Sequence, residues 1–220
     1  MDIKLPGNNG KSGATLYSNV SVLVNGRSVV LNLANVSSDL HGLPWEDITY
    51  KGVVSRSSCW LVQPGCCCPY KYGGKSWKPA FWLKWIEKTA RALEHKLKLP
   101  FSFLNSCNCN KYAGPKEALG YHSDDEPMFR QSEFERDVYI VSVSFGQSRA
   151  FSIRKKYGET LGPIKLVDGS ILTMHGRMQD DYQHAVLPSS SDTCSIRFNL
   201  TFRAVLRHVK KCQFCRQSKS

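Results

Sequence analysis

The stretch RFNLTFR at residues 197–203 decides the fold class of this chain. Side chains alternate between the two faces of a β-strand, so this stretch has one polar and one apolar face. The polar face carries Arg197, Asn199, Thr201 and Arg203, and the apolar face carries Phe198, Leu200 and Phe202. An apolar strand face has to pack against a core, which predicts a sheet whose other face lines a polar site.

The polar face of this strand indicates an anionic ligand. Arg197 and Arg203 share that face, and two guanidinium groups repel each other unless an anion lies between them. A dicarboxylate would give each arginine one carboxylate for bidentate pairing. The partner implied is 2-oxoglutarate.

A second stretch, YHSDDEP at residues 121–127, supplies metal ligands. In an extended chain His122 and Asp124 point the same way and can bind one metal ion, and His184 completes the set. Two histidines and one carboxylate leave open positions on an octahedral ion, as in non-haem Fe(II) oxygenases. The 2-oxo acid and O2 would bind in those positions.

These motifs follow one another in an order that resembles a known family, the AlkB family of Fe(II)- and 2-oxoglutarate-dependent nucleic-acid demethylases. The resemblance runs from about Val53 to Leu206 and is strongest to the eukaryotic type that repairs alkylated DNA and RNA. It includes NKY at 110–112, VSVSFG at 141–146 and QHAVLP at 183–188. It implies a mainly β domain with flanking helices (α+β), of the double-stranded β-helix or jelly-roll fold.

The resemblance also implies the residues that hold the co-substrate. Asn110 and Tyr112 should hydrogen-bond 2-oxoglutarate, beside Asn199 and Thr201. Arg197 should pair with the far carboxylate and Arg203 with the carboxylate next to the 2-oxo group.

Five residues are candidates for binding the substrate. By the resemblance, Glu126 accepts a hydrogen bond from the exocyclic amine of a flipped base, which suits adenine and cytosine over uracil; the alternative is a solvated acidic turn. Tyr70 and Tyr72 either stack on the base or belong to the core. Arg149 and Arg154 either bind phosphate or form a solvated rim.

The reaction implied is oxidative demethylation of N1-methyladenine and N3-methylcytosine in single-stranded DNA or RNA, by a monomer. Two alternatives lie within the class: an RNA N6-methyladenine demethylase, and a viral enzyme that protects an RNA genome. A third is a basic nucleic-acid-binding protein without activity. The sequence does not separate DNA from RNA.

Charge supports a polyanionic partner. The 220 residues hold 30 Lys and Arg against 18 Asp and Glu, a formal net charge of +12. Nucleic acid is the first candidate and an anionic membrane surface the second.

No apolar run reaches the roughly 18 residues of a spanning helix, and the N-terminus lacks a signal sequence, so we expect an intracellular protein, in nucleus or cytoplasm. Asp180 and Asp181 would add carboxylates near the mouth of the groove.

The chain divides into four expected segments. These are a disordered lead-in over 1–14, an N-terminal extension over 15–52 that packs on the core, the dioxygenase domain over 53–206, and a basic Cys-containing tail over 207–220. Asn25-Gly26 predicts a hairpin within the extension, and a short helix is expected between Asp39 and Trp45. A longer helix is expected to open at Ser76, with Pro79 in its first turn.

The nine cysteines are an odd number and fall in clusters. Cys212 and Cys215 have zinc-ligand spacing, but a structural site needs four ligands and no second pair is evident. We therefore interpret them as free thiols in the tail. The role of the Cys66-Cys67-Cys68 run stays open.

Overall fold

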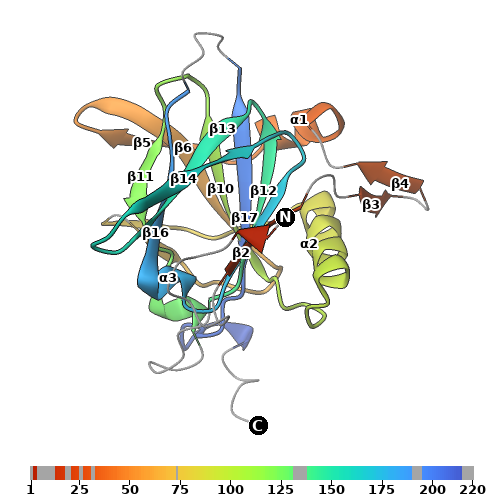
Figure 1. Cartoon of the computed structure of the whole chain (residues 1–220). Coiled ribbons are helices and arrows are strands. Elements are labelled where there is room, and N and C mark those ends of the chain that lie inside the picture. The colour runs from red at the N-terminus through yellow and green to blue at the C-terminus, as the bar shows by residue number, and fades with distance from the viewer. Residues whose placement is uncertain are drawn as a thin grey trace.

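The computed structural model describes residues 2–3, 13–17, 21–24, 27–30, 33–72, 74–130, 138–189 and 195–214. Within these ranges two largely antiparallel sheets face each other, and α2 lies beside the larger one (Figure 1). This is the predicted mainly β, jelly-roll type of architecture.

The larger sheet has nine strands among the described residues. Eight form a continuous path, in the spatial order β1 (Asp2–Ile3), β2 (Gly13–Tyr17), β15 (Ile171–His175), β12 (Ile140–Gly146), β17 (Arg197–Arg203), β10 (Ser106–Tyr112), β6 (Val53–Val62) and β5 (Glu46–Tyr50). The ninth, β9 (Ala80–Phe81), pairs in parallel with β6. The strand that carries the two arginines, β17, is therefore central, between β12 and β10.

The smaller sheet lies across the polar face of β17. Its spatial order is β11 (Leu119–His122), β16 (Tyr182–Val186), β13 (Arg149–Lys155) and β14 (Thr160–Leu166). Two separate hairpins consist of β3 (Ser21–Val24) with β4 (Arg27–Val30), and β7 (Tyr70–Tyr72) with β8 (Lys75–Trp77). The first confirms the hairpin predicted around Asn25-Gly26, although those two turn residues lie outside the described ranges.

The helices are α1 (Leu33–His41), α2 (Lys84–Leu97), α3 (Met178–Asp181) and the 3-10 turn η1 (Pro127–Phe129). The predicted start of α2 was wrong. Ser76 lies in β8, which pairs with β7 (Tyr70↔Trp77), and this hairpin overrides the helix signal of Ser76 and Pro79. The first predicted helix lies earlier than expected, and Trp45 instead follows it, donating from Nε1 to Leu40 O (2.9 Å).

Two apolar layers lie on opposite sides of the larger sheet. Phe198, Leu200 and Phe202 pack with α1 and α2 on the outer side, as the alternation in β17 predicted. The inner layer, between the sheets, contains Trp60, Tyr112 and Phe151. The polar residues of β17 face this inner space, so the site lies between the sheets.

The N-terminal segment differs from the expectation of a disordered lead-in where the structure describes it. Asp2–Ile3 pairs with β2, and β2 pairs with β15 along its whole length. Ala14 is buried in the inner layer. Residues 4–12 lie outside the described ranges. Within the extension, β5 pairs with β6 and α1 joins the outer layer.

In the part of the chain that the structure describes, no helix has the length and apolar character needed to cross a bilayer.

Candidate metal centre and anion site

Three predicted metal ligands converge between the sheets. β11 and β16 are antiparallel neighbours with His122 directly opposite His184. Asp124 follows β11 by two residues, and its two carboxylate oxygens lie 3.8 Å from His122 Nε2 and 3.7 Å from His184 Nε2. All three ligand atoms lie within 4.8 Å of one another, which is the spacing for a single ion. Alternation along an extended chain predicted that His122 and Asp124 point the same way. In the structure, the pairing of β11 with β16 contributes more to this geometry, because it brings the two histidines together.

Neighbouring groups orient each ligand. His122 Nδ1 lies 2.8 Å from Gly120 O, so it carries the proton and leaves Nε2 free to bind a metal. Phe151 stacks on the His184 ring with centroids 5.3 Å apart. The Asp124 amide donates to Gln179 Oε1 (2.9 Å). The ligands are therefore held in place by contacts of their own.

The electrostatics favour the metal-binding protonation states. Burial and the neighbouring His122 lower the pKa of His184 to about 3, so its imidazole is neutral. Burial alone would raise the pKa of Asp124, but Arg203 and the two histidines outweigh it and hold that pKa well below its usual value. Neutral imidazoles and an ionised carboxylate are the forms that bind a cation.

The arginines of β17 have unused donors. Arg203 Nη2 lies 2.7 Å from Asp124 Oδ2, and Arg197 Nη2 donates to Ser144 Oγ (3.1 Å). The Nε and Nη1 atoms of both side chains are buried and have no hydrogen-bond partner among the described residues. A buried donor without a partner costs about 1–3 kcal/mol. An anion such as 2-oxoglutarate would satisfy these donors, so the residues fit that group.

Four more predicted residues complete the wall between the arginines and the metal ligands. Asn110 lies opposite Asn199, and Tyr112 opposite Arg197, on the paired strands β10 and β17. Thr201 Oγ1 donates to Asn199 Oδ1 (2.8 Å). Asn110, Tyr112, Asn199 and Thr201 line one cavity together with Arg203 and the three metal ligands.

Sequence reasoning missed Arg56. This β6 residue is buried, lines the same cavity, and donates from Nε to Asn110 Oδ1 (3.0 Å). The contact fixes the Asn110 amide so that its NH2 group remains available as a donor to a ligand. A lone arginine in the otherwise uncharged stretch 53–62 was the available signal, because an arginine is rarely buried without a purpose.

Glu126 and the two tyrosines form the wall beside the metal ligands. Tyr70 is buried, stacks on Trp60 (centroids 4.8 Å apart), and donates to Glu126 Oε1 (2.7 Å). Glu126 Oε2 is buried with no hydrogen-bond partner among the described residues. Burial, followed by repulsion from Asp124, raises the pKa of Glu126 to about 7. Tyr72 is partly exposed and meets the His122 ring edge-on at 6.0 Å.

Arg149 and Arg154 occupy different environments. Arg149 is buried and donates to four backbone carbonyls, those of Gly114, Pro115, Glu117 and Leu187. The structure therefore does not bring it to the cavity. Arg154 lies over the Tyr121 ring at 4.0 Å and donates twice to Gln183 Oε1. It lines a depression that also includes Lys155, Lys156 and the fully exposed Tyr157.

The two acidic residues that the sequence places before Tyr182 lie in α3 and are paired with arginines. Asp180 lies 2.8 Å from Arg130 Nη2, and Asp181 lies 2.9 Å from Arg177 Nη2. Their negative charges are therefore largely offset.

The sequence is similar to those of known oxygenases. A family model described as the 2OG-Fe(II) oxygenase superfamily matches residues 45–203. Human alpha-ketoglutarate-dependent dioxygenase alkB homolog 3 is 33% identical over 181 residues, which cover 74% of this chain and 58% of that protein. DNA oxidative demethylase ALKBH2 of Arabidopsis thaliana is 34% identical over 131 residues, which cover 49% of this chain and 40% of that protein. The chain thus spans about half the length of these curated relatives.

Among solved structures, that of OsALKBH1 superposes with a TM-score of 0.56 at 17% identity. The match covers 78% of this chain and 90% of that one. It supports the jelly-roll assignment of the fold.

Proposed function

Because the chain belongs to the 2OG-Fe(II) oxygenase superfamily and, within it, to the AlkB family, we propose that it removes methyl groups oxidatively from base nitrogens of nucleic acid. The proposed substrates are N1-methyladenine and N3-methylcytosine in single-stranded DNA or RNA. One observation carries the proposal: the buried His122, Asp124 and His184 set lies beside two arginines whose Nε and Nη1 donors have no partner among the described residues.

His122, Asp124 and His184 would hold Fe(II), and the iron, once bound with 2-oxoglutarate, would activate O2. In the balanced reaction, 2-oxoglutarate loses CO2 and becomes succinate, which takes one oxygen atom. The other oxygen atom enters a C–H bond of the N-methyl group. The C–N bond of the resulting N-hydroxymethyl group then breaks. The hydroxymethyl carbon leaves as formaldehyde, and the base nitrogen is left without its methyl group.

The residues of the chain contribute position and exclusion of water. Arg197 and Arg203 would hold the two carboxylates of 2-oxoglutarate, and Asn110 would donate to it from the NH2 group that Arg56 leaves free. The site is buried between two sheets, where such hydrogen bonds are stronger than in water.

Base selection would rest on Glu126 and Tyr72. The unpaired Glu126 Oε2 is available to accept from the exocyclic amine of adenine or cytosine. Methylation at N1 of adenine or N3 of cytosine leaves a cationic base, which a carboxylate attracts. Tyr72 is partly exposed and lies beside His122, where its ring could stack on the base. A base that cannot pair also flips out of a nucleic-acid duplex at a lower cost in free energy.

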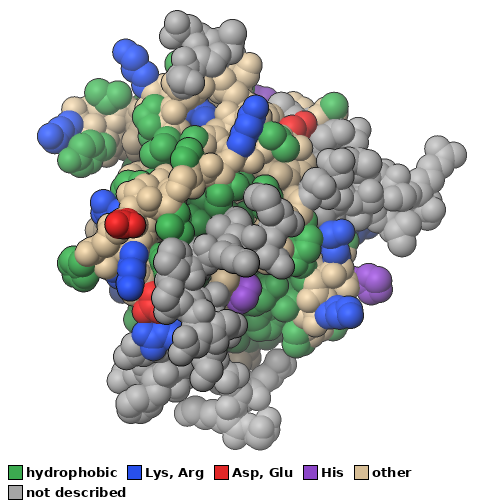
Figure 2. Space-filling view, in the orientation of Figure 1, with side chains coloured by type: hydrophobic (Ala, Val, Ile, Leu, Met, Phe, Trp, Pro, Cys, Tyr) green, Lys and Arg blue, Asp and Glu red, His purple; other side chains and the backbone are tan. Residues whose placement is uncertain are grey.

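A groove beside the cavity is suited to the nucleic-acid strand. It shares Arg56, Tyr72 and Leu119 with the cavity, so the two are continuous. Its other walls bring aromatic and basic side chains together, including Tyr50, Lys75, Trp77 and Lys116. Figure 2 shows Lys and Arg side chains along the side of the molecule that carries β5, β11 and β14. Such a mixture binds phosphates and stacks on bases.

The test uses matched single-stranded DNA and RNA oligonucleotides that carry N1-methyladenine, N3-methylcytosine or N6-methyladenine. We expect Fe(II)-dependent release of succinate and formaldehyde with the first two lesions. His122→Ala, Asp124→Ala and His184→Ala should each abolish turnover while the fold remains, because each removes a ligand. His95→Ala, an exposed histidine on α2, is the matched control. Full turnover in any of the three ligand variants would contradict the proposal.

A further inference from the structure

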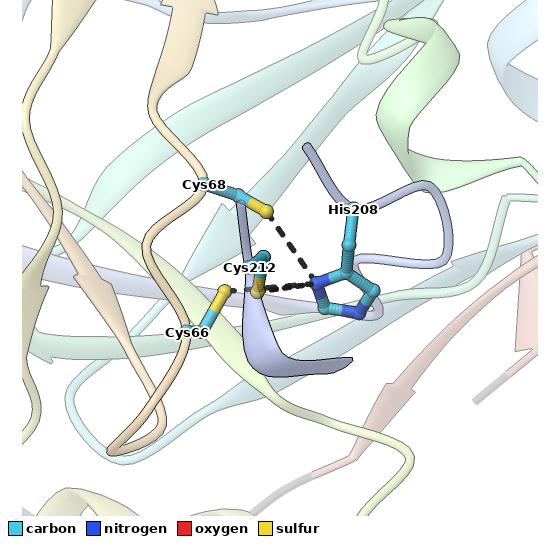
Figure 3. A group of neighbouring side chains, drawn as sticks. All are labelled: Cys66, Cys68, His208 and Cys212. Atoms are coloured by element: carbon cyan, nitrogen blue, oxygen red, sulfur yellow. Dashed lines mark hydrogen bonds between the residues drawn. The ribbon is translucent and has the colours of Figure 1, made fainter. Parts of the chain in front are cut away.

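Four metal-binding side chains form a second cluster, separate from the residues described above. Cys66 and Cys68 lie in the loop between β6 and β7, and His208 and Cys212 follow β17 (Figure 3). The two segments are 140 residues apart, counted between Cys68 and His208. The three cysteines are buried and His208 is partly buried. No residue is shared with the His122, Asp124 and His184 set.

The three sulfurs surround a single nitrogen. Cys68 Sγ and Cys212 Sγ each lie 3.4 Å from His208 Nδ1, and Cys66 Sγ lies 3.8 Å from it. Figure 3 shows the three contacts meeting at that ring atom. One imidazole nitrogen carries at most one hydrogen or one lone pair, so it can satisfy only one of the three thiols. Hydrogen bonding to that nitrogen therefore does not account for all three contacts.

The distances match the edges of a zinc tetrahedron. Zinc binds sulfur at about 2.3 Å and imidazole nitrogen at about 2.0–2.1 Å, so a tetrahedral site has S···N edges of about 3.6 Å. The observed distances of 3.4, 3.4 and 3.8 Å fall on both sides of that value. All four ligand atoms lie within 4.8 Å of one another, so one ion could contact all of them.

The backbone presents these ligands through two tight turns. Gly65 has a φ of +88°, a conformation that favours glycine, and the Cys66 amide donates to Gln63 O (3.1 Å). On the other segment the Cys212 amide donates to Val209 O (2.8 Å), which brings Cys212 back toward His208.

One of the sulfurs also accepts a hydrogen bond from the backbone. The Val209 amide donates to Cys68 Sγ (3.4 Å). Amide donors stabilise a thiolate, the form that binds metal. The Phe214 ring also packs against the His208 ring, with centroids 5.6 Å apart, and so holds the imidazole in position.

We propose that Cys66, Cys68, His208 and Cys212 bind one zinc ion as a closed, structural site. Three thiolates and one imidazole form a complete four-ligand set, leaving no position for substrate. The fourth ligand is His208, not a second cysteine pair, and Cys215 lies outside the described residues. The zinc would join the segment after β17 to the loop before β7, which carries Tyr70 and Tyr72 of the cavity wall.

The experiment uses the full chain with Asp124→Ala, which disables the other metal site. After exposure to zinc and gel filtration, metal analysis should find one zinc per chain. Cobalt in place of zinc should give the intense visible absorption of a tetrahedral site and sulfur-to-cobalt charge-transfer bands. Cys212→Ser and His208→Ala should lose the zinc and both spectral features. Cys67→Ser is the matched control, because this neighbouring thiol is outside the cluster and should retain them.

The Asp124→Ala chain decides the question even if the cysteine variants fail to fold. A folded chain without zinc and without thiolate-to-cobalt bands would overturn the proposal. A disulfide between Cys66 and Cys212 in protein purified under reducing conditions, found by mass spectrometry, would overturn it as well. So would equal loss of zinc in Cys67→Ser and Cys212→Ser. None of these outcomes bears on demethylation, which the ligand variants of the first site test.

Discussion

Arg203 contacts a metal ligand and still has donor atoms to spare. Its Nη2 atom lies 2.7 Å from the metal ligand Asp124, while Nε and Nη1 have no hydrogen-bond partner among the described residues. One planar group can therefore orient the metal ligand and hold a carboxylate beside it. Lysine cannot do both, because its charge is a single point on a flexible stem.

Replacing Arg203 with lysine should weaken 2-oxoglutarate binding. Hydrogen bonds to charged groups contribute about 1.5–3 kcal/mol, so the KM for 2-oxoglutarate should rise roughly ten- to hundredfold. Succinate release measured against 2-oxoglutarate concentration gives this value. Arg177→Lys, at a partly exposed ion pair with Asp181, is the control and should leave the KM unchanged. An unchanged KM in Arg203→Lys would remove this arginine from the co-substrate site.

Glu126→Gln tests base choice. The amide keeps size and shape, but it can turn a donor toward the base, so an acceptor worth about 1–3 kcal/mol is lost. The rate on methylated adenine and cytosine should fall roughly five- to hundredfold, and the rate on methylated thymine or uracil should fall less or rise. Parallel assays on oligonucleotides with each lesion measure the ratio. Equal losses on all bases would mean that Glu126 supports the metal site and does not read the base.

At the scale of elements, the β13–β14 hairpin carries exposed basic and aromatic side chains. Lys155 and Tyr157 are exposed at its turn, and Arg154 lies at the edge of the same depression. Lys156 is engaged with Asp125 and with Gln179 O. Lys155 and Tyr157 are therefore the hairpin residues best placed to meet a strand.

Removing these two side chains should have different effects on single-strand binding. Tyr157→Ala should lower affinity roughly five- to hundredfold, because stacking on one base contributes about 1–3 kcal/mol. Lys155→Ala should reduce the slope of log affinity against log salt by about 0.7, the value for one phosphate contact. Fluorescence anisotropy across a salt series measures both. The control is Lys96→Ala, on α2 beside the larger sheet; an unchanged slope in Lys155→Ala would place the strand elsewhere.

The strands could be predicted from the sequence because alternation is a local signal. β17 has the polar and apolar faces that its sequence indicated, and Phe198, Leu200 and Phe202 lie in the outer layer. The start of α2 could not be predicted in this way, because a non-local choice, the β7–β8 hairpin, occupies the residues that signal a helix.

The parts of the candidate site that belong to sequence motifs with fixed spacing could be predicted. His122, Asp124 and His184 converge as expected, and the residues of β17 line the cavity or lie next to it. Arg56 was missed, and so was His208 in the separate cysteine cluster. Each contacts a partner far along the chain, 54 residues away for Arg56 and Asn110, and 140 for His208 and Cys68. No spacing rule relates such residues before the fold is known.

At the scale of the molecule, Arg149 forms hydrogen bonds with two loops at one end of the smaller sheet. It donates to carbonyls in the segment 114–117, which precedes β11, and to Leu187, which follows β16. Both strands carry a metal ligand. Its position in the interior therefore contributes to stability and, through the two strands, to the shape of the site.

Arg149→Met should destabilise the protein by about 3–5 kcal/mol, because several buried carbonyls lose their donor while the apolar stem remains. Urea denaturation followed by fluorescence measures the free energy of unfolding. Arg154→Met, on the same strand, loses hydrogen bonds to Gln183 and the contact with the Tyr121 ring at a partly exposed position, and should cost less, about 1–2 kcal/mol. Equal effects of the two variants would indicate that water replaces the guanidinium at the four carbonyls.

The pairing of β2 with β15 has a consequence for the order of events on the ribosome. Thr173 Oγ1 hydrogen-bonds Thr15 O across a separation of 158 residues. At about 5–20 residues per second, roughly 8 to 32 s pass between synthesis of the first strand and of its partner. During that interval β2 has no neighbour on its β15 side, and its backbone groups are open to other chains or to chaperones. Growing chains halted with β15 still inside the ribosomal exit tunnel and with β15 fully outside it should therefore differ sharply in protease resistance at β2.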